Sequence, residues 1–140
     1  MLYVETDDSC GVCGIRGNER LTIHHIDGDS ANNGYDNQIV ICYNCHQQHH
    51  QRRTLKQRDI QTRKRHLIRK TLTQYGVNAM IIAARNNFGV VAMPFLLYHL
   101  VQLGYMTKEE EVMAYGEQND STARFAITDA GRKVLLKWLR

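Results

Sequence analysis

Two cysteine pairs are the clearest chemical feature of the first 50 residues. Cys10 and Cys13 form one Cys-x2-Cys pair, Cys42 and Cys45 form a second, and residues 14–41 lie between them. Four thiolates supplied by two such pairs suit a tetrahedral zinc ion in a closed structural site. The intervening segment is longer than the roughly 15–20 residues of common zinc ribbons, so we expect additional structure between the pairs. The alternative interpretation is four free, buried cysteines.

The histidines of this region fall into two groups with different geometry. His24 and His25 are adjacent in the predicted strand LTIHHI, so their side chains point to opposite faces unless a bulge reorients one of them. We therefore expect the two histidines to have different roles. His46 and His50 are four residues apart in the predicted helix YNCHQQHH, where both imidazoles lie on one face and could share a single ion.

Short elements are expected to position these residues. Residues 21–26 and 38–43 predict two strands, and the turn-rich residues 27–36 predict the loop that joins them. A helix over residues 43–50 follows the second strand directly. His49 faces elsewhere on this helix, and we expect it to be solvated.

The sequence shows no sign of a membrane span or of a secretory signal, which favours a reducing compartment. No stretch approaches the roughly 18–20 apolar residues of a membrane span, and the first ten residues, MLYVETDDSC, are too polar and acidic for a secretory signal. We therefore expect a cytoplasmic protein that binds no membrane. In a reducing cytoplasm, cysteines grouped as two close pairs are metal ligands more often than disulfides.

Taken together, these segments resemble one family. The pieces CGVC, IHHIDGDSANN and NQIVICYNCHQQHH resemble the motif of the H-N-H (HNH) endonucleases, which have the ββα-metal fold, in the version that carries zinc-binding cysteine pairs. The order is a histidine pair, a long loop, Asn37 at the head of the second strand, Cys-x2-Cys-His, and a last histidine four residues on. The resemblance covers about the first 50 residues.

The resemblance implies a role for each of these residues. His25 would be the general base that activates the attacking water, and Asn37 would brace the loop that orients this base. His24, His46 and His50 would bind one catalytic divalent ion. Phosphodiester hydrolysis needs a base that titrates near neutrality, as imidazole does, and a cation that stabilises charge on the phosphate and the leaving oxygen.

The identity of the catalytic ion stays open among Mg²⁺, Mn²⁺, Ni²⁺ and Zn²⁺. Many members of the family have an acidic residue before the base, whereas this chain has His24. Three imidazoles suit Zn²⁺, Ni²⁺ or Mn²⁺ better than Mg²⁺. Asp27 and Asp29 lie nearby in the sequence, but aspartates beside glycine in a loop are more often turn formers than ligands.

A basic block follows the histidine-rich helix. Residues 51–70 contain nine of the 18 lysines and arginines and only one acidic residue. The apolar residues of this block recur at the spacing of one helix face, which predicts an amphipathic helix. We expect this helix to end at Gly76. The block is a candidate contact for the phosphates of double-stranded DNA, and a solvated helix face is the alternative. The candidate nucleic-acid-binding residues are Arg52, Arg53, Lys56, Arg58, Arg63, Lys64 and Arg65.

Residues 76–140 resemble a winged helix-turn-helix domain. The segment MPFLLYHLVQLGYM predicts a helix that begins near Pro94. Two predicted strands, over about 105–114 and 123–128, would form the wing. The segment FAITDAGRKVL resembles the strand-to-helix exit of bacterial winged-helix regulators. The predicted recognition helix has no arginine or lysine, so dimerisation or protein docking is as well supported as target recognition. The remaining candidate DNA contacts here are Arg85, Asn86, Asn87 and Arg124.

The expected architecture is α+β with three parts. Residues 1–52 are predicted to form the zinc-containing nuclease module, 53–75 a basic helical connector, and 76–140 a winged-helix-like domain through which two copies could form a homodimer. The predicted function is a metal-dependent DNA endonuclease that nicks or cuts both strands, of a phage, homing or restriction type in a bacterium or a phage-infected cell.

Two other functions stay open. The first alternative is a non-catalytic, zinc-containing winged-helix regulator that binds DNA. An RNA nuclease or RNA-binding protein is the second, and it is less favoured because the chain lacks the aromatic-rich pattern of single-stranded RNA readers.

Overall fold

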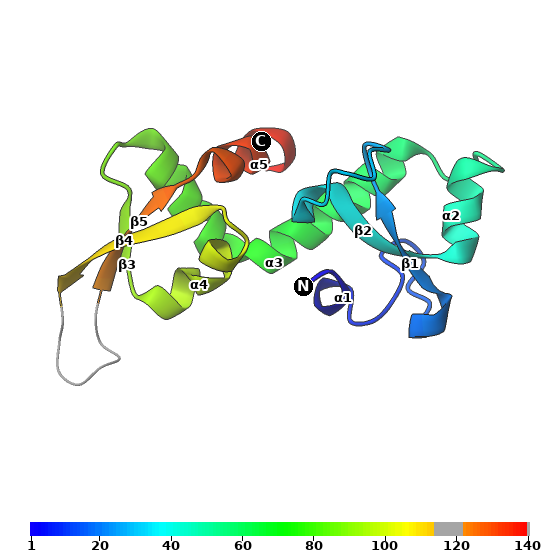
Figure 1. Cartoon of the computed structure of the whole chain (residues 1–140), viewed down its shortest axis with the longest axis horizontal. Helices are drawn as coiled ribbons and strands as arrows, with labels where there is room; N and C mark the ends of the chain where they lie inside the picture. The colour runs from blue at the N-terminus through cyan, green and yellow to red at the C-terminus, as the bar shows by residue number, and fades with distance from the viewer. Residues whose placement is uncertain (114–121, 140) are drawn as a thin grey trace. The chain divides into compact units, whose positions relative to one another are not determined.

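The computed structural model describes residues 1–113 and 122–139. The chain divides into two compact units, Met1–Thr71 and Leu72–Arg140, which are described separately below (Figure 1). Helices and strands both contribute, and the predicted α+β class is confirmed. The basic block of residues 51–70 belongs to unit 1, and the boundary between the units falls inside the predicted connector of residues 53–75. Among the described helices, none combines the length and the apolar character needed to cross a membrane.

Unit 1 is built on an antiparallel hairpin followed directly by a helix. Strand β1 (Leu21–His25) pairs with strand β2 (Gln38–Cys42), and this register places His25 opposite Gln38. Helix α2 (Tyr43–His50) begins at the residue after β2. The predicted strand, loop, strand and helix are therefore confirmed, with bounds that agree to within about one residue.

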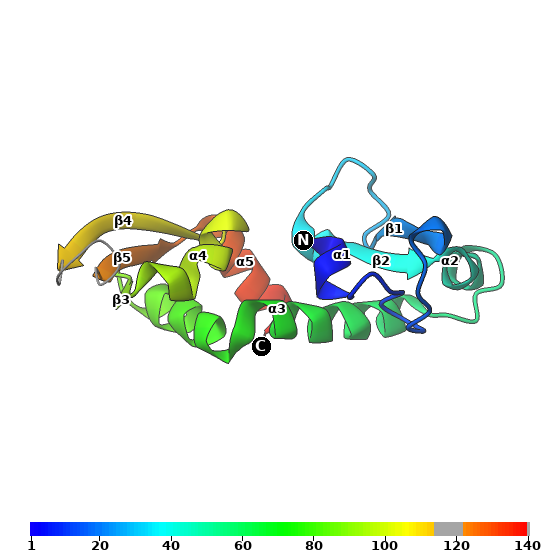
Figure 2. The ribbon, with the colours of Figure 1, turned by 90° about the horizontal axis from the view of Figure 1, so that it is seen from below.

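The core of unit 1 lies between the hairpin and a long helix. The remaining elements are α1 (Leu2–Glu5), the 3-10 helices η1 (Asn18–Arg20) and η2 (Tyr35–Asn37), and the first part of α3 (Gln57–Arg85). Ile39, Val40 and Ile41 of β2 are fully buried, as are Ile60 and Ile68 of α3. Figure 2 shows the first part of α3 running along the hairpin and α1. Burial of these aliphatic side chains supplies the main apolar stabilisation of this small unit.

Helix α3 is interrupted at Thr73 rather than ended at Gly76. Thr73 has a left-handed backbone (φ 58°, ψ 160°), and its hydroxyl accepts a hydrogen bond from the Gly76 amide at 3.2 Å, so it caps the second helical part. Gly76 is inside that second part and is buried, and a Cβ at this position would lie 3.1 Å from Nε2 of His99. The prediction that Gly76 ends the helix is wrong. Glycine is favoured there because helix α4 packs closely against it.

Unit 2 contains a three-stranded antiparallel sheet and three helical segments. Besides the second part of α3, its elements are β3 (Val90–Ala92), α4 (Pro94–Gln102), β4 (Met106–Met113), β5 (Thr122–Ile127) and α5 (Asp129–Trp138). The strand order is β3-β5-β4. The two predicted strands of the wing correspond to β4 and β5, but residue 114 of the first lies outside the described residues. Strand β3, which the sequence did not indicate, adds a third strand.

The helix-turn-helix part of the expected winged domain is not formed in the described residues of unit 2. Such a motif needs two consecutive helices joined by a short turn. Here β3 separates α3 from α4, and α4 ends in a Schellman motif, with the Gly104 amide donating to Val101 O and the Tyr105 amide donating to Leu100 O, both at 2.9 Å. Gly104 has φ +72°, which turns the chain directly into β4. Helix α4 therefore has no partner helix before the sheet.

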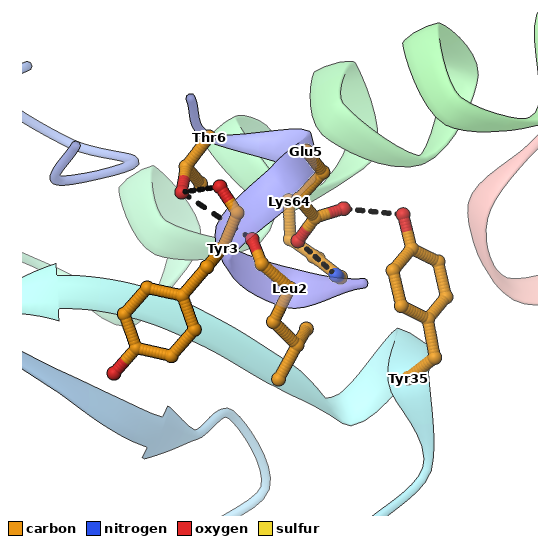
Figure 3. A network of polar contacts seen from close by, with 6 residues as sticks. All are labelled: Leu2, Tyr3, Glu5, Thr6, Tyr35 and Lys64. Atoms are coloured by element: carbon orange, nitrogen blue, oxygen red, sulfur yellow. Dashed lines mark hydrogen bonds and ion pairs between the residues drawn. The ribbon is translucent and has the colours of Figure 1, made fainter. Parts of the chain in front are cut away.

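A buried ion pair ties the N-terminus of unit 1 to α3. Nζ of Lys64 lies 2.7 Å from Oε1 of Glu5, and both side chains are 0% exposed (Figure 3). The Tyr35 hydroxyl donates to Oε2 of Glu5, and Lys64 Nζ lies 3.8 Å from the centroid of the Tyr35 ring. The prediction that Lys64 contacts nucleic acid is wrong, because its ammonium group is enclosed by the protein.

Replacing Lys64 by methionine is expected to destabilise unit 1 by about 3–5 kcal/mol. The variant leaves the Glu5 carboxylate buried without its cation, which costs more than the loss of a surface pair. The double variant Glu5→Gln/Lys64→Met removes both charges and keeps an acceptor for Tyr35, so it should lose less stability than Lys64→Met alone. Urea unfolding of the zinc-loaded proteins measures both effects. Equal stability of wild type and Lys64→Met would contradict the assignment of a buried charge pair.

Candidate metal centres and active site

The four cysteines converge in unit 1. Their Sγ atoms all lie within 4.8 Å of one another, with Cys10, Cys42 and Cys45 buried and Cys13 exposed. In the first pair the amide of Gly14 donates to Cys10 O at 2.9 Å, and Gly14 has φ +75°, so the chain turns tightly around the Cys10 sulfur. In the second pair Cys42 caps α2, and its Sγ accepts from the Cys45 amide at 3.4 Å. This arrangement suits a tetrahedral zinc ion.

Thiol chemistry also fits a cation at this cluster. Burial raises the pKa of the Cys10 thiol, but hydrogen bonds from the backbone of Cys13, Cys42 and Val12 outweigh this effect and lower the pKa to about 7. Burial is the main cause that raises the pKa of the Cys45 thiol, followed by its hydrogen bond with Cys42 and by the negative charge of the Cys10 thiolate. A divalent cation would compensate this charge, because it binds the deprotonated form of each cysteine.

Three histidines form a second cluster, from β1 and one face of α2. One ring nitrogen from each of His24, His46 and His50 lies within 4.8 Å of the others. The ring centroids of His46 and His50 are 4.4 Å apart, and that of His24 is 5.5 Å from His46 and 5.2 Å from His50. His24 is 4% exposed, and its Nε2 is buried without a hydrogen-bond partner in the described structure. A metal ion would satisfy this orphaned nitrogen.

His25 lies on the other side of the strand, as the alternation of side chains predicts. Its Nε2 is 3.0 Å from Asn33 Oδ1 and 3.0 Å from Gln38 Nε2, and Gln38 Nε2 also donates to Asn33 Oδ1 at 3.0 Å. Nε2 of His25 can serve only one of the two partners. If Nε2 carries the proton it donates to Asn33 and the lone pair of Nδ1 is free to accept a proton, whereas a bare Nε2 accepts from Gln38. Sequence reasoning missed both partners, although Gln38 could have been found as the residue opposite His25 in the hairpin.

Asn37 closes the base of the loop between the strands. It is 1% exposed, and its Nδ2 donates to Asp27 Oδ1 at 2.8 Å and to Asn32 O at 3.0 Å. Its Oδ1 accepts from the Asp27 amide at 3.1 Å. These bonds connect both ends of the loop that carries Asn33, so Asn37 reaches His25 only through this loop.

Comparison with known proteins identifies the segment that contains both clusters. Residues 10–52 match the family model HNH endonuclease. No curated protein and no solved structure matched the chain. The HNH segment includes all four cysteines, the three clustered histidines, His25 and Asn37, and it supports a nuclease of the HNH type.

Two aspartates in the HNH segment shape its loop. Asp27 Oδ1 accepts from the Asp29 amide, and Asp29 Oδ1 accepts from the Ala31 amide, both at 2.9 Å. Asp27 Oδ2 accepts from Asn32 Nδ2 at 2.7 Å. The two bonds to the Asp29 and Ala31 amides are the side-chain to backbone bonds of Asx turns, so the expectation that the aspartates form turns is confirmed.

His49 of the HNH segment is less solvated than expected. It is half-buried, its Nδ1 lies 3.0 Å from Leu55 O, and its ring centroid is 5.0 Å from that of His24. This contact ties the end of α2 to the loop that leads into α3. His49 therefore contributes to the wall of the histidine cluster without joining its ligand set.

The basic side chains of residues 52–70, at the end of the HNH match and after it, are available at the surface, apart from Lys64. Arg58 lies 3.9 Å from Asp59 in an exposed pair, and the other exposed candidates form no ion pair within the described parts of the chain. In unit 2, by contrast, Arg124 is paired with Glu109 at 2.8 Å and Glu110 at 2.7 Å, which offsets its charge. The exposed candidates in unit 1 are Arg52, Arg53, Lys56, Arg58, Arg63 and Arg65.

Without an ion in the histidine cluster, acid is expected to destabilise the protein through His24. Burial, followed by the nearby His49, His50 and His46, lowers the pKa of His24 to about 4 from 6.5. Because the folded-state pKa is the lower one, stability is complete above about pH 6.5 and is lost as the pH falls towards 4. At about 1.4 kcal/mol per pKa unit, the loss between pH 7 and pH 5 is about 2 kcal/mol.

The variant His24→Gln isolates this effect, because it keeps a polar side chain but cannot titrate. Urea unfolding of wild type and His24→Gln at pH 7 and pH 5, with zinc in the cysteine cluster and no second ion, gives the comparison. The difference between the two proteins should change by about 2 kcal/mol. The same pH dependence in both proteins would rule out His24 as its source.

Proposed function

We propose that this protein is a metal-dependent DNA endonuclease that hydrolyses phosphodiester bonds. The observation that carries the proposal is the buried, unpartnered Nε2 of His24 beside His46 and His50, next to His25, within the segment that matches the HNH family. His24, His46 and His50 would hold the catalytic ion, while the cysteine cluster would hold a structural zinc. The two sites share no residue, so one ion can be structural while the other is catalytic.

His25 acts as the general base in this proposal. In the tautomer that this role requires, the Nε2–H group donates to Asn33 Oδ1 and Nδ1 takes the proton of the attacking water. Asn37 holds the loop through its bond to Asn32 O, and Asn33 of this loop orients the base. The ion, when bound, stabilises the charge that develops on the phosphate and on the leaving oxygen.

Double-stranded DNA is the proposed substrate. The exposed arginines and lysine at the end of the HNH match and after it would contact the DNA phosphates, which gives affinity without sequence choice. One such centre cuts one strand, so the monomer would nick DNA, and two copies joined through unit 2 would cut both strands. We place the enzyme among phage, homing or restriction nucleases that act in the cytoplasm of a bacterium or an infected host.

Conversion of supercoiled plasmid tests the proposal. Purified protein is incubated with plasmid and Mg²⁺, Mn²⁺, Ni²⁺ or Zn²⁺, and in parallel with a chelator. Nicked or linear DNA should form with at least one ion and disappear with the chelator. No conversion of plasmid or genomic DNA with any ion would instead favour a DNA-binding regulator. The regulator is the weaker candidate, because unit 2 has no helix-turn-helix pair in its described residues and Arg124 is already paired.

A further inference from the structure

Residues on both sides of the HNH segment meet a residue inside it. Glu5 precedes the segment that matches the family and Lys64 follows it, yet their buried ion pair lies directly against Tyr35 (Figure 3). The Tyr35 hydroxyl donates to one carboxylate oxygen of Glu5, and Lys64 contacts the other at 2.7 Å. The two charges are closed to water, and the half-buried phenol shares the Glu5 carboxylate with Lys64.

Tyr35 stands at the end of the loop that orients the candidate base. It opens η2 (Tyr35–Asn37), two residues after Asn33 and two before Asn37. Residues 27–34 are all exposed, so packing does not fix this part of the loop. Its conformation depends on hydrogen bonds among its own residues and on η2, where half-buried Tyr35 and buried Asn37 return the chain to the core.

We propose that Glu5, Tyr35 and Lys64 are positioning residues that hold the loop of residues 27–37, so that Asn33 keeps His25 in the orientation of a general base. The inference rests on the proposed function of His25. A buried charge pair suits this task, because moving either member away from its partner leaves an unpaired charge in the interior. A side chain near the reacting atoms needs placement to within about 1 Å, and a misplacement of that size can cost about 10²-fold in rate.

Tyr35→Phe is the variant that tests the inference. It removes one hydroxyl and leaves the ring beside Lys64, so the protein should still fold and keep its zinc. We expect kcat for DNA cleavage to fall by about tenfold or more, while KM changes by less than about twofold, because phosphate contacts lie elsewhere. Tyr75→Phe is the matched control, since it removes the hydroxyl of an exposed tyrosine in unit 2 and should leave both constants unchanged.

A second readout does not depend on activity. Nitrogen-15 NMR of the histidine rings reports which nitrogen of His25 carries the proton. We expect Nε2 to be protonated in wild type and in Tyr75→Phe, and we expect Tyr35→Phe to show a mixture of tautomers or exchange broadening. A purely structural role for Tyr35 would lower stability without changing the His25 signals.

The two readouts separate the inference from the function on which it rests. If Tyr35→Phe cleaves DNA as wild type does and its His25 signals are unchanged, the positioning role is overturned while the nuclease stands. If wild type cleaves no DNA with any ion but the His25 signals change in Tyr35→Phe, the nuclease fails while the positioning of His25 stands. If neither cleavage nor a change in the signals is found, both fail.

Discussion

His25→Ala is expected to lower the rate of DNA cleavage by about 10²–10⁴-fold, the usual contribution of a well-placed general base. Metal and DNA affinity should stay close to those of wild type, because His25 lies on the opposite side of β1 from the clustered histidines and its ring contacts Asn33 and Gln38. Single-turnover cleavage of a labelled duplex, at saturating metal and protein, measures the effect on the chemical step.

Exogenous imidazole sharpens this test. It should restore part of the activity of His25→Ala, since a small base can occupy the space left by the side chain. His66→Ala is the control, because His66 is exposed on α3 outside the HNH match. Cleavage by His25→Ala at the wild-type rate would exclude His25 as the base.

Cys42→Ser is expected to release zinc and unfold unit 1. Cys42 is both a member of the cysteine cluster and the N-cap of α2, so its loss removes a ligand at the junction of the hairpin and the helix that carries His46 and His50. Structural zinc contributes about 10–16 kcal/mol of apparent binding free energy in small zinc domains, which exceeds the stability of most domains. Unit 2 has its own buried core, including Leu97, Leu100 and Phe125, and should stay folded.

Zinc content by mass spectrometry and amide NMR spectra measure this outcome together. The spectrum of Cys42→Ser should lose the dispersed signals of unit 1 and keep those of unit 2, and a chelator should do the same to wild type. His46→Ala is the control, because it removes a residue of the histidine cluster and should retain the structural zinc. A zinc-free Cys42→Ser protein with a native spectrum would show that the cysteine cluster does not support the fold.

Local patterns in the sequence predicted most of the hairpin, α2 and the two clusters. Alternation along β1 separates His24 from His25, and the spacing of four residues brings His46 and His50 to one face of α2. The two cysteine pairs likewise predict a shared site, because each pair is a tight turn whose sulfurs point inward. These features depend on neighbours in the chain, which the sequence displays directly.

Features that depend on distant partners could not be predicted. Lys64 looks like any other cation of the basic block, and only Glu5, 59 residues away, distinguishes it. Gly76 has the local character of a helix stop, but its close approach to His99 decides its place inside α3. The left-handed backbone of Thr73 has no local signal, because a β-branched residue disfavours that conformation.

Interactions around the base were missed for a related reason. Asn33 lies among loop residues whose amides and carboxylates all suit turns, so its side chain could not be singled out. Its role emerges only when the hairpin register places Gln38 opposite His25 and the loop folds back over both. The HNH pattern therefore indicated His25 as the candidate base, whereas the contacts of its ring required the tertiary structure.

Coupled measurement of metal occupancy and cleavage most directly tests the claim that the histidine cluster binds the ion that cleavage requires. Protein that contains only its structural zinc is titrated with Mn²⁺ or Ni²⁺, and bound metal and single-turnover cleavage are recorded in the same samples for wild type and His46→Ala. We predict that the rate rises with occupancy, saturates at about one added ion per chain, and is lost together with binding in His46→Ala. Full cleavage by His46→Ala, or an occupied site in wild type that cleaves no DNA, would contradict the account.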